Sequence, residues 1–390
     1  MGQPGPRAAT LVPAAAIGWT KPMPLKKRNS APRSTPHRFP DLAYRPRDPV
    51  GREFDIGLIG CGGITEHHLK AYRSAGYRVS VLCDIDRKAA VARRDAFYPD
   101  AAITTDYQIV VADPQIDVVD IATHPHVRAP IVADALRAGK HVLSQKPFVL
   151  DLSTGEALAD LAEQQQVRLA VNQNGRWAPH FSWLREAVTE GLVGDVSSVH
   201  CGIFWDHTWV VGTSFENISH LVLYDFAIHW FDFLTTIFPD RRATRVYSAT
   251  AQAASQPIES PLLAHVAVEY PQGQATLVFA AHTPHGSLDE IYIAGSAGSL
   301  RSFGSDSNHQ TVELCTAQGV YRPRLDGTGF PDGFHGTMGE LLRAIEEDRE
   351  PMHSARSNLR SLELCFAALA SAESGAAVVP GTVRALPAAE

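Results

Sequence analysis

The sequence predicts an α/β protein, with a doubly wound parallel sheet followed by an α+β domain that has an open, mainly antiparallel sheet. Three observations predict this fold. Short apolar runs alternate with helical segments between residues 54 and 173, glycines or polar turns close those helices, and longer β-type runs follow after residue 240. Alternating strands and helices require parallel strands with right-handed crossovers, whereas successive β runs with tight turns favour antiparallel pairing.

The first domain is expected at residues 52–173. Short apolar runs bounded by turn residues are predicted as strands: 54–60, 77–84, 117–123, 140–146 and 167–173. The segments between and after them are predicted as loops and helices: 61–76, 86–98, 126–139 and 153–166. The last helix is expected to open with a capping box, because Ser153 and Glu156 stand three residues apart.

The second domain is expected at residues 174–390. Its helices are predicted at 180–194, 220–238, 336–348 and 357–375. Its β runs are predicted at 244–253, 263–270, 274–283, 289–300 and 311–317. Pro271, Gln272 and Gly273 predict a hairpin turn between the second and third of these runs.

Residues 1–51 are predicted to form an extended, basic arm. The first 50 residues contain ten of the 26 prolines and nine Lys/Arg against two Asp/Glu. Because the whole chain has a net charge of −7 and the arm carries +7, the other 340 residues carry −14. An acidic body argues against nucleic acid as the main partner.

Composition also bounds the compartment. No stretch reaches the roughly 18 continuous apolar residues of a membrane span, so no membrane partner is expected. There are five cysteines and no C-x-x-C pair, which argues against a disulfide framework or a zinc site. We therefore expect a cytoplasmic protein.

The turn after the first strand predicts a dinucleotide-binding site of the Rossmann type. Gly60 and Gly62 occupy the first two positions of G-x-G-x-x-G, Gly63 follows them, and Thr65 stands at the third position. Glycines at these places permit a tight turn and let backbone N–H groups approach a pyrophosphate at a helix N-terminus. The alternative is a glycine turn that binds nothing.

Asp84, at the end of the second strand, favours NAD over NADP. A carboxylate there can bind the ribose diol and repels a 2′-phosphate, and Asp86 could share that role. Arg87 leaves NADP open, since a guanidinium can hold a 2′-phosphate. Further cofactor contacts are expected from residues on the same rim: Ile64, Thr123, His126, Gln145 and Lys146.

Lys146 ends the strand 140–146 and precedes Pro147. In a doubly wound sheet, ligands bind beyond the carboxyl ends of the strands, so Lys146 should share a rim with Gly60 and Asp84. It could there reach the nicotinamide and a substrate hydroxyl or carbonyl. The alternative is that proline simply ends the strand beside a solvated lysine.

Asp225 and His229 lie four residues apart on a predicted helix, hence on one face. The imidazole could accept a proton while the carboxylate orients it and favours its charged form. A buried polar pair is the alternative. A metal pair is a further option, but no third and fourth ligand stand out, so no metal site is predicted.

These residues, in this order, resemble the Gfo/Idh/MocA oxidoreductases over about residues 54–380. The resemblance implies NAD-dependent oxidation of a sugar, sugar derivative or cyclitol, with Lys146, Asp225 and His229 as the catalytic residues. It also implies that the open sheet forms a dimer or tetramer interface, and that the bond before Pro147 is often cis. The family usually has Glu where this chain has Gln145, which removes a charge beside Lys146.

The segment 172–181 resembles one that lines the substrate cleft in this family. Three of its side chains are candidates to hydrogen-bond sugar hydroxyls: Asn172, Asn174 and Arg176. Three tryptophans could stack on a pyranose or equally fill a core or interface: Trp177, Trp205 and Trp209. Two rival functions are a glycosidase that retains NAD and a non-catalytic dinucleotide-binding regulator.

Overall fold

The computed structural model describes residues 41–386, so residues 1–40 of the predicted arm lie outside the described range. The remaining end of the arm is anchored to the body. Leu42 and Tyr44 are buried. The Tyr44 carbonyl accepts a hydrogen bond from Ser182 Oγ at 2.7 Å, and its hydroxyl accepts one from the Asp326 N–H at 2.8 Å.

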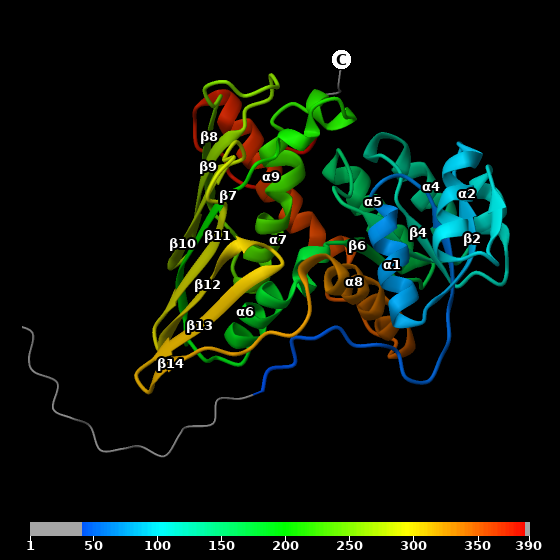
Figure 1. The fold of residues 1–390 in the computed structure, drawn as a ribbon, viewed down its shortest axis with the longest axis horizontal. Helices are drawn as coiled ribbons and strands as arrows, with labels where there is room; N and C mark the ends of the chain where they lie inside the picture. Colours follow the sequence, from blue (N-terminus) through cyan, green and yellow to red (C-terminus); the bar gives the residue numbers. More distant parts are fainter. Residues whose placement is uncertain (1–40, 387–390) are drawn as a thin grey trace, which may run out of the picture. The chain divides into compact units, whose positions relative to one another are not determined.

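The N-terminal half forms a six-stranded parallel sheet in the order β3-β2-β1-β4-β5-β6, which confirms the predicted doubly wound sheet (Figure 1). The strands are β1 (Asp55–Ile59), β2 (Arg78–Cys83), β3 (Ala102–Thr104), β4 (Val118–Ile121), β5 (His141–Gln145) and β6 (Leu169–Asn172). The connecting helices are α1 (Thr65–Ala75), α2 (Arg87–Phe97), α3 (Tyr107–Ala112), α4 (Pro125–Arg137) and α5 (Leu152–Gln164). The order reverses between β1 and β4, where such sheets bind ligands.

Two of the parallel strands are completely buried. Every residue of β4 and β6 is buried, and the polar exceptions in them are Asp120 and Asn172. The sequence did not indicate β3 or α3, because a three-residue strand and a six-residue helix are too short to show periodicity.

The C-terminal half forms an eight-stranded sheet in the order β14-β13-β12-β11-β7-β10-β9-β8. Neighbouring strands are antiparallel except β7 and β10, which run parallel, so the mainly antiparallel sheet is confirmed. The strands are β7 (Val196–Phe204), β8 (Arg245–Ala251), β9 (Leu263–Tyr270), β10 (Gly273–Ala280), β11 (Leu288–Gly295), β12 (Gly298–Asp306), β13 (His309–Thr316) and β14 (Gly319–Tyr321).

The sequence predicted the hairpin of this sheet but not strand β7, which lies between β11 and β10. Tyr270 pairs with Gly273, so Pro271 and Gln272 form the predicted turn. Strand β7 was not predicted, because Ser, His and Gly occupy its outward positions and weaken the alternation. The run 289–300 was predicted as one β segment, but it divides into β11 and β12 at a two-residue turn flanked by glycines.

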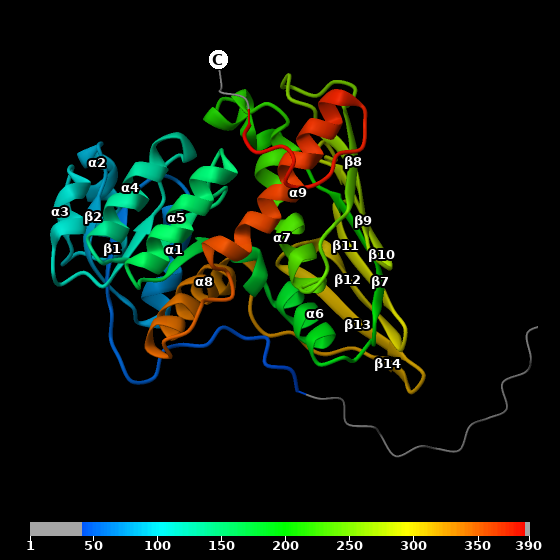
Figure 2. The ribbon, with the colours of Figure 1, turned by 180° about the vertical axis from the view of Figure 1, so that it is seen from behind.

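Three helices lie on one face of this sheet (Figures 1 and 2): α6 (Pro179–Thr189), α7 (Ile228–Ile237) and α9 (Ala355–Ser374). Among residues 41–386, no helix lies on the opposite face in either view. That face exposes Tyr247, Val278 and Tyr292. No helix in the described range is long and apolar enough to cross a membrane.

The predicted capping box of α5 is wrong. The N-cap is Asp151, whose Oδ1 accepts a hydrogen bond from the Thr154 N–H at 2.7 Å. A carboxylate is a strong N-cap and was available one residue before the helix. Ser153 and Glu156 instead bind Arg384 of the C-terminal segment.

Helix α8 (Gly329–Glu346) joins the C-terminal half to the first domain. It begins seven residues before the predicted helix and packs against α1 (Figure 2). Phe334 and Met338 share a buried cluster with Leu58 and Leu69 of the first domain. The core beside the glycine turn is therefore completed by a segment about 270 residues further along the chain.

Candidate active site

The glycine turn lies at the carboxyl end of β1, in front of α1. Gly60 has φ +94°, and a Cβ there would come within 2.9 Å of the Ala122 backbone, so glycine is required. Gly62 and Gly63 are exposed, and apart from adjacent residues no atom of residues 41–386 lies within 4 Å of a Cβ built on either one. This open space at a helix N-terminus fits the pyrophosphate of a dinucleotide.

Asp84 ties the glycine turn to the end of β2. Its carboxylate accepts hydrogen bonds from the Cys61 N–H at 2.6 Å and the Asp86 N–H at 2.8 Å. Arg93 on α2 donates to the carbonyls of Gly62 and Gly63 at 3.1 and 3.3 Å. Sequence reasoning missed Arg93, since nothing in the pattern distinguishes it from neighbouring arginines.

Alanine at two neighbouring glycines is expected to have different effects. Gly60→Ala should destabilise the fold by about 1–3 kcal/mol, because it combines positive φ with a backbone clash. Gly62→Ala should leave thermal unfolding unchanged but weaken NADH binding, because its Cβ projects into free space where the cofactor would lie. Thermal melts and NADH fluorescence titrations check both; equal losses of stability would contradict this reading.

Lys146 follows the carboxyl end of β5, and its bond to Pro147 is cis. Its side chain is 16% exposed. The ammonium lies 3.0 Å from Asp225 Oδ1 and 3.0 Å from the Asp225 carbonyl. The structure therefore brings together two residues that are 79 positions apart in the sequence.

Asp225 and His229 flank an irregular helix start. The predicted helix 220–238 is not continuous: residues Val222–Phe226 form a π-helical turn, η5, and α7 begins at Ile228. Asp225 binds Lys146, and no hydrogen bond joins it to His229 in the described range. From the sequence, Asp225 was expected to orient the His229 imidazole. In the structure its carboxylate instead accepts a hydrogen bond from Lys146.

His229 is held in its uncharged form. Burial, and secondarily the charge of Lys146, keeps the pKa of His229 well below its usual value. Its Nδ1 is buried and has no hydrogen-bond partner in residues 41–386. Because Nδ1 is enclosed, Nε2 is the nitrogen of this neutral imidazole that could accept a proton from a bound hydroxyl. Within the same residues, no group of three or more His, Cys, Asp or Glu is arranged to hold a metal ion.

Gln145 and Asn172 point into the protein behind Lys146. Gln145 is 6% exposed, and its amide bonds the Lys146 N–H and His68. Asn172 is fully buried, with its Nδ2 3.2 Å from His68 Nε2. Gln145 uses both ends of its amide inside the protein, whereas Asn172 Oδ1 is buried without a hydrogen-bond partner in the described residues. Burial therefore keeps both side chains from the ligand contact expected from the sequence.

The loop after β4 carries Thr123 and His126. His126 is exposed in the first turn of α4, and Thr123 Oγ1 is buried without a hydrogen-bond partner in the described residues. Arg128, which the sequence did not single out, is 2% exposed and donates to the carbonyls of Thr123, Gln145 and Pro147. It binds the loop after β4 to the loop after β5.

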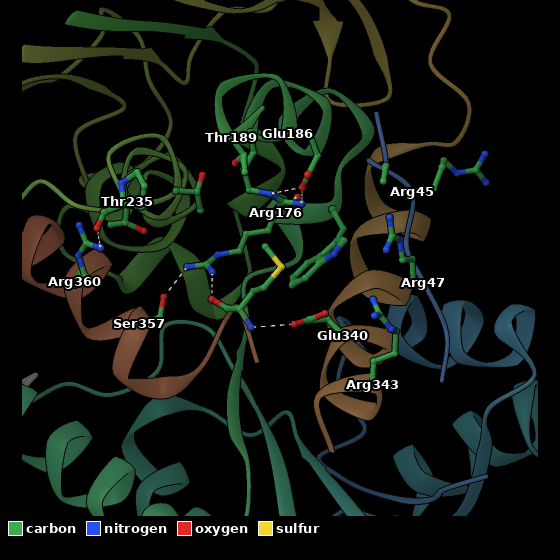
Figure 3. Close-up of a pocket in the computed structure, with 16 residues that line it drawn as sticks. Arg45, Arg47, Arg176, Glu186, Thr189, Thr235, Glu340, Arg343, Ser357 and Arg360 are labelled. Carbon is green, nitrogen blue, oxygen red and sulfur yellow. Dashed lines mark hydrogen bonds and ion pairs between the residues drawn. The ribbon is translucent and has the colours of Figure 1, made fainter. Parts of the chain in front are cut away.

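Arg176 lines a pocket of about 560 Å³ that includes neither Lys146, Asp225 nor His229 (Figure 3). Arg176 belongs to the short 3₁₀ helix η2 (Asn174–Trp177). Its Nε and Nη2 donate to Asp232 at 2.6 and 2.7 Å, and its guanidinium also bonds the Met352 carbonyl and Ser357. Because these donors are engaged, we leave Arg176 out of the proposed substrate contacts.

The three tryptophans have different surroundings. Trp177 is 5% exposed and packs directly on Gly336, so it fills the core. Trp205 stacks on His207, with ring centroids 5.4 Å apart. Trp209 is 56% exposed, and its ring centroid lies 6.3 Å from that of Phe226, the residue after Asp225. Trp209 is the one of the three that is free to stack on a ligand.

Sequence comparisons match most of the described chain. Residues 54–173 match the family described as "Oxidoreductase family, NAD-binding Rossmann fold", and residues 181–301 match the "GFO/IDH/MocA C-terminal domain". D-apiose dehydrogenase from Paraburkholderia graminis is 27% identical over 357 residues, covering 84% of this chain and 90% of that protein. Inositol 2-dehydrogenase from Rhizobium meliloti is 26% identical over 327 residues, covering 81% and 96%.

Solved structures share the fold. An oxidoreductase from Agrobacterium radiobacter in complex with NAD+, L-tartaric acid and magnesium aligns with a TM-score of 0.76 at 20% identity, over 85% of this chain and 99% of that one. Levoglucosan dehydrogenase in complex with NADH and levoglucosan aligns with a TM-score of 0.74 at 18% identity, over 85% and 100%. Since the two family matches together span more than half of its length, the chain belongs to the Gfo/Idh/MocA oxidoreductase family.

Proposed function

We propose that the protein is an NAD(H)-dependent dehydrogenase that moves a hydride between the nicotinamide and a CH–OH carbon of a sugar, sugar derivative or cyclitol. One observation carries the proposal: Lys146 and Asp225 are paired at 3.0 Å beside an uncharged His229, on the sheet edge that bears the glycine turn. The relatives named above act on an apiose sugar and an inositol, which supports this substrate class.

Each residue has a distinct role in the proposed reaction. Lys146 Nζ donates a hydrogen bond to the substrate oxygen and stabilises the negative charge that develops there. His229 accepts the hydroxyl proton, which its neutral imidazole can do. Asp225 fixes the position of the ammonium. Bound NAD would supply the hydride acceptor.

Substrate contacts beyond this group are proposed from two neighbours. Trp209 offers an exposed ring beside Phe226, the residue that follows Asp225, and the apolar face of a sugar ring can stack on such a surface. Asn174, on η2 after β6, is 9% exposed and offers an amide for a hydroxyl. Gln145 and Arg176 are omitted because their polar groups are engaged inside the protein, and Asn172 is omitted because it is fully buried.

NAD is the proposed cofactor, and NADH should bind at least about tenfold tighter than NADPH, which is about 1.4 kcal/mol. The Asp84 carboxylate lies at the end of β2, where it would repel a 2′-phosphate. Asp84→Ala should reduce the ratio of NADH affinity to NADPH affinity. It should also weaken the binding of both cofactors, because the Asp84 side chain holds the glycine turn. Arg87→Ala removes an exposed guanidinium that could hold a 2′-phosphate, so this variant should keep or increase the preference for NADH. Fluorescence titrations that give equal or reversed affinities for the wild type would refute the choice.

A homo-oligomer is proposed through the bare face of the second sheet. Val278 on β10 and Tyr292 on β11 expose 41% and 44% of their surface there, and exposed apolar side chains of this kind can be covered by self-association. Light scattering should report a mass above the 42.3 kDa of one chain. Val278→Lys with Tyr292→Lys should shift the mass toward one chain without loss of fold. A wild-type monomer at micromolar concentration would contradict the proposal.

The proposed activity is tested by incubating the protein with NAD and a panel of aldoses, sugar acids and inositols while following NADH absorbance. NADH should accumulate with at least one member. Because the chain has six tryptophans, the same member should reduce quenching of the total tryptophan fluorescence in the wild type but not in Trp209→Phe. The five cysteines are all unpaired, which supports the expected reducing compartment and permits the assay in thiol buffer.

A further inference from the structure

A buried chain of hydrogen bonds lies behind Lys146. The Lys146 N–H donates to Gln145 Oε1 at 2.6 Å, and Gln145 Nε2 lies 3.0 Å from His68 Nε2. His68 Nδ1 lies 2.7 Å from Asp120 Oδ2, which also accepts a hydrogen bond from the Tyr72 hydroxyl at 2.8 Å. His68, Asp120 and Tyr72 are fully buried. The chain therefore links α1 and β4 to the strand end that carries Lys146.

The direction of every bond in this chain follows from one backbone group. An N–H can only donate, so the oxygen of the Gln145 amide must face Lys146 and its NH₂ must face His68. His68 Nε2 must then be the acceptor, which leaves the ring proton on Nδ1, pointing at Asp120. The Asn172 amide lies 3.2 Å from the same Nε2 and can present its NH₂ to it. His68 is thus uncharged, with a defined tautomer.

We propose that Gln145 and His68 are positioning residues for Lys146, and that the neutral amide of Gln145 holds His68 uncharged in its Nδ1–H tautomer. The inference rests on the proposed dehydrogenase function and deepens it. Gln145 fixes the Lys146 N–H, while Arg128 fixes the carbonyls of Gln145 and Pro147 on either side. The main chain beside Lys146 is therefore held at three groups: the Lys146 N–H, the Gln145 carbonyl and the Pro147 carbonyl. Arg128, which holds the two carbonyls, also binds the Thr123 carbonyl in the loop after β4.

A glutamate at position 145 would change the chemistry of this chain. Its carboxylate could still accept from Lys146, but it would place an acceptor against the lone pair of His68 Nε2. Two facing acceptors at 3.0 Å require a proton between them. The titratable or charged groups around His68 are Tyr72 and His67 on α1, Asp120 on β4 and, beyond Asp120, Arg128 on α4. Helix α8 contributes the apolar ring of Phe334.

The first test does not need turnover. In the wild type with NADH, ¹⁵N NMR of the His68 ring should show a protonated Nδ1 and an unprotonated Nε2 at neutral pH. Gln145→Glu should convert the ring to a protonated or proton-sharing pattern at low pH. Gln145→Met should speed hydrogen exchange of the Lys146 amide. A wild-type ring protonated at Nε2, or an amide equally protected in Gln145→Met, would overturn the proposal.

The second test uses kinetics, with Gln173→Met as the matched control. Gln173 is a buried glutamine just after β6, and its amide has no hydrogen-bond partner among residues 41–386. Gln145→Met should lower kcat by about tenfold or more with little change in NADH affinity, since small misplacement of a catalytic group is costly. Gln145→Glu should recover turnover at low pH and lose it as pH rises and the shared proton leaves, a limb absent from the wild type.

The outcomes separate this inference from the proposed function. If no sugar or cyclitol is oxidised by the wild type, the proposed function fails, while ring NMR and amide exchange still decide the hydrogen-bond chain. If the wild type turns over but Gln145→Met and Gln173→Met have equal kcat, the positioning role is refuted. A fall in kcat for Gln145→Met without the new pH limb in Gln145→Glu would refute the neutral-tautomer assignment.

Discussion

Replacing Lys146 with methionine is expected to lower kcat by about a hundred- to a thousandfold, roughly 2.7–4 kcal/mol of transition-state stabilisation. Methionine retains the unbranched apolar stem of the side chain but removes the ammonium that lies 3.0 Å from Asp225. That charge is needed most as an alkoxide develops on the substrate. NADH affinity should change much less, because the glycine turn and Asp84 hold other parts of the cofactor in the proposed complex.

Lys140→Met provides the control for this measurement. Lys140 precedes the opposite end of β5, is 7% exposed, and donates to the carbonyls of Asp113 and Ile116. Its loss should lower stability and leave kcat unchanged. Adding His229→Ala to Lys146→Met should be little worse than the worse single change, since both act on one O–H group. Full turnover by Lys146→Met on the best substrate would reduce the lysine to a strand-end charge.

Asp289→Asn is expected to stabilise the protein by about 4 kcal/mol above neutral pH. Asp289 lies on β11 facing the helices, is 1% exposed, and neither carboxylate oxygen has a hydrogen-bond partner within residues 41–386. Burial, with a smaller contribution from the charge of Asp306, raises the pKa of Asp289 from 3.8 to about 7. An ionised form must therefore be buried without compensation at physiological pH.

The sign of the pH dependence follows from the two states. The folded protein keeps the Asp289 proton up to a pKa of about 7, whereas the unfolded chain releases it near 3.8. The contribution of Asp289 is thus lost as pH rises between about 4 and 7 and stays lost above. Denaturant melts should show the variant and wild type converging at low pH. Glu290→Gln changes a neighbouring side chain that is 41% exposed, and its stability should not diverge from that of the wild type as pH rises. If the stabilities of Asp289→Asn and the wild type ran parallel over the whole pH range, the assignment would be contradicted.

The rim of the active site could be predicted because one topological rule places it. Strand ends of a parallel sheet share an edge, so Gly60, Asp84 and Lys146 could be brought together from the sequence alone. The predicted helix 220–238 placed Asp225 and His229 in one segment, which the structure divides into η5 and α7. Each of these inferences uses local periodicity and chain direction, which a sequence records directly.

The partners of polar side chains could not be predicted, because they depend on packing between remote segments. Arg176 was predicted to bind a substrate hydroxyl, but its guanidinium is paired with Asp232, 56 positions away. Gln145 was expected beside the cofactor but turns toward His68, 77 positions away. The π-helical turn before α7 gives no periodic signal, and it accompanies the contact of Asp225 with the lysine.

The central claim, hydride transfer from a carbinol carbon of a sugar or cyclitol, is tested most directly by mass spectrometry of the cofactor. The full-length protein would be incubated with NAD and substrates deuterated at single carbinol carbons. The account predicts that one substrate delivers its deuterium to the cofactor, which accumulates as labelled NADH beside an equal amount of keto product. Unlabelled cofactor with every substrate, or cleavage of a glycoside with no net NADH, would contradict it.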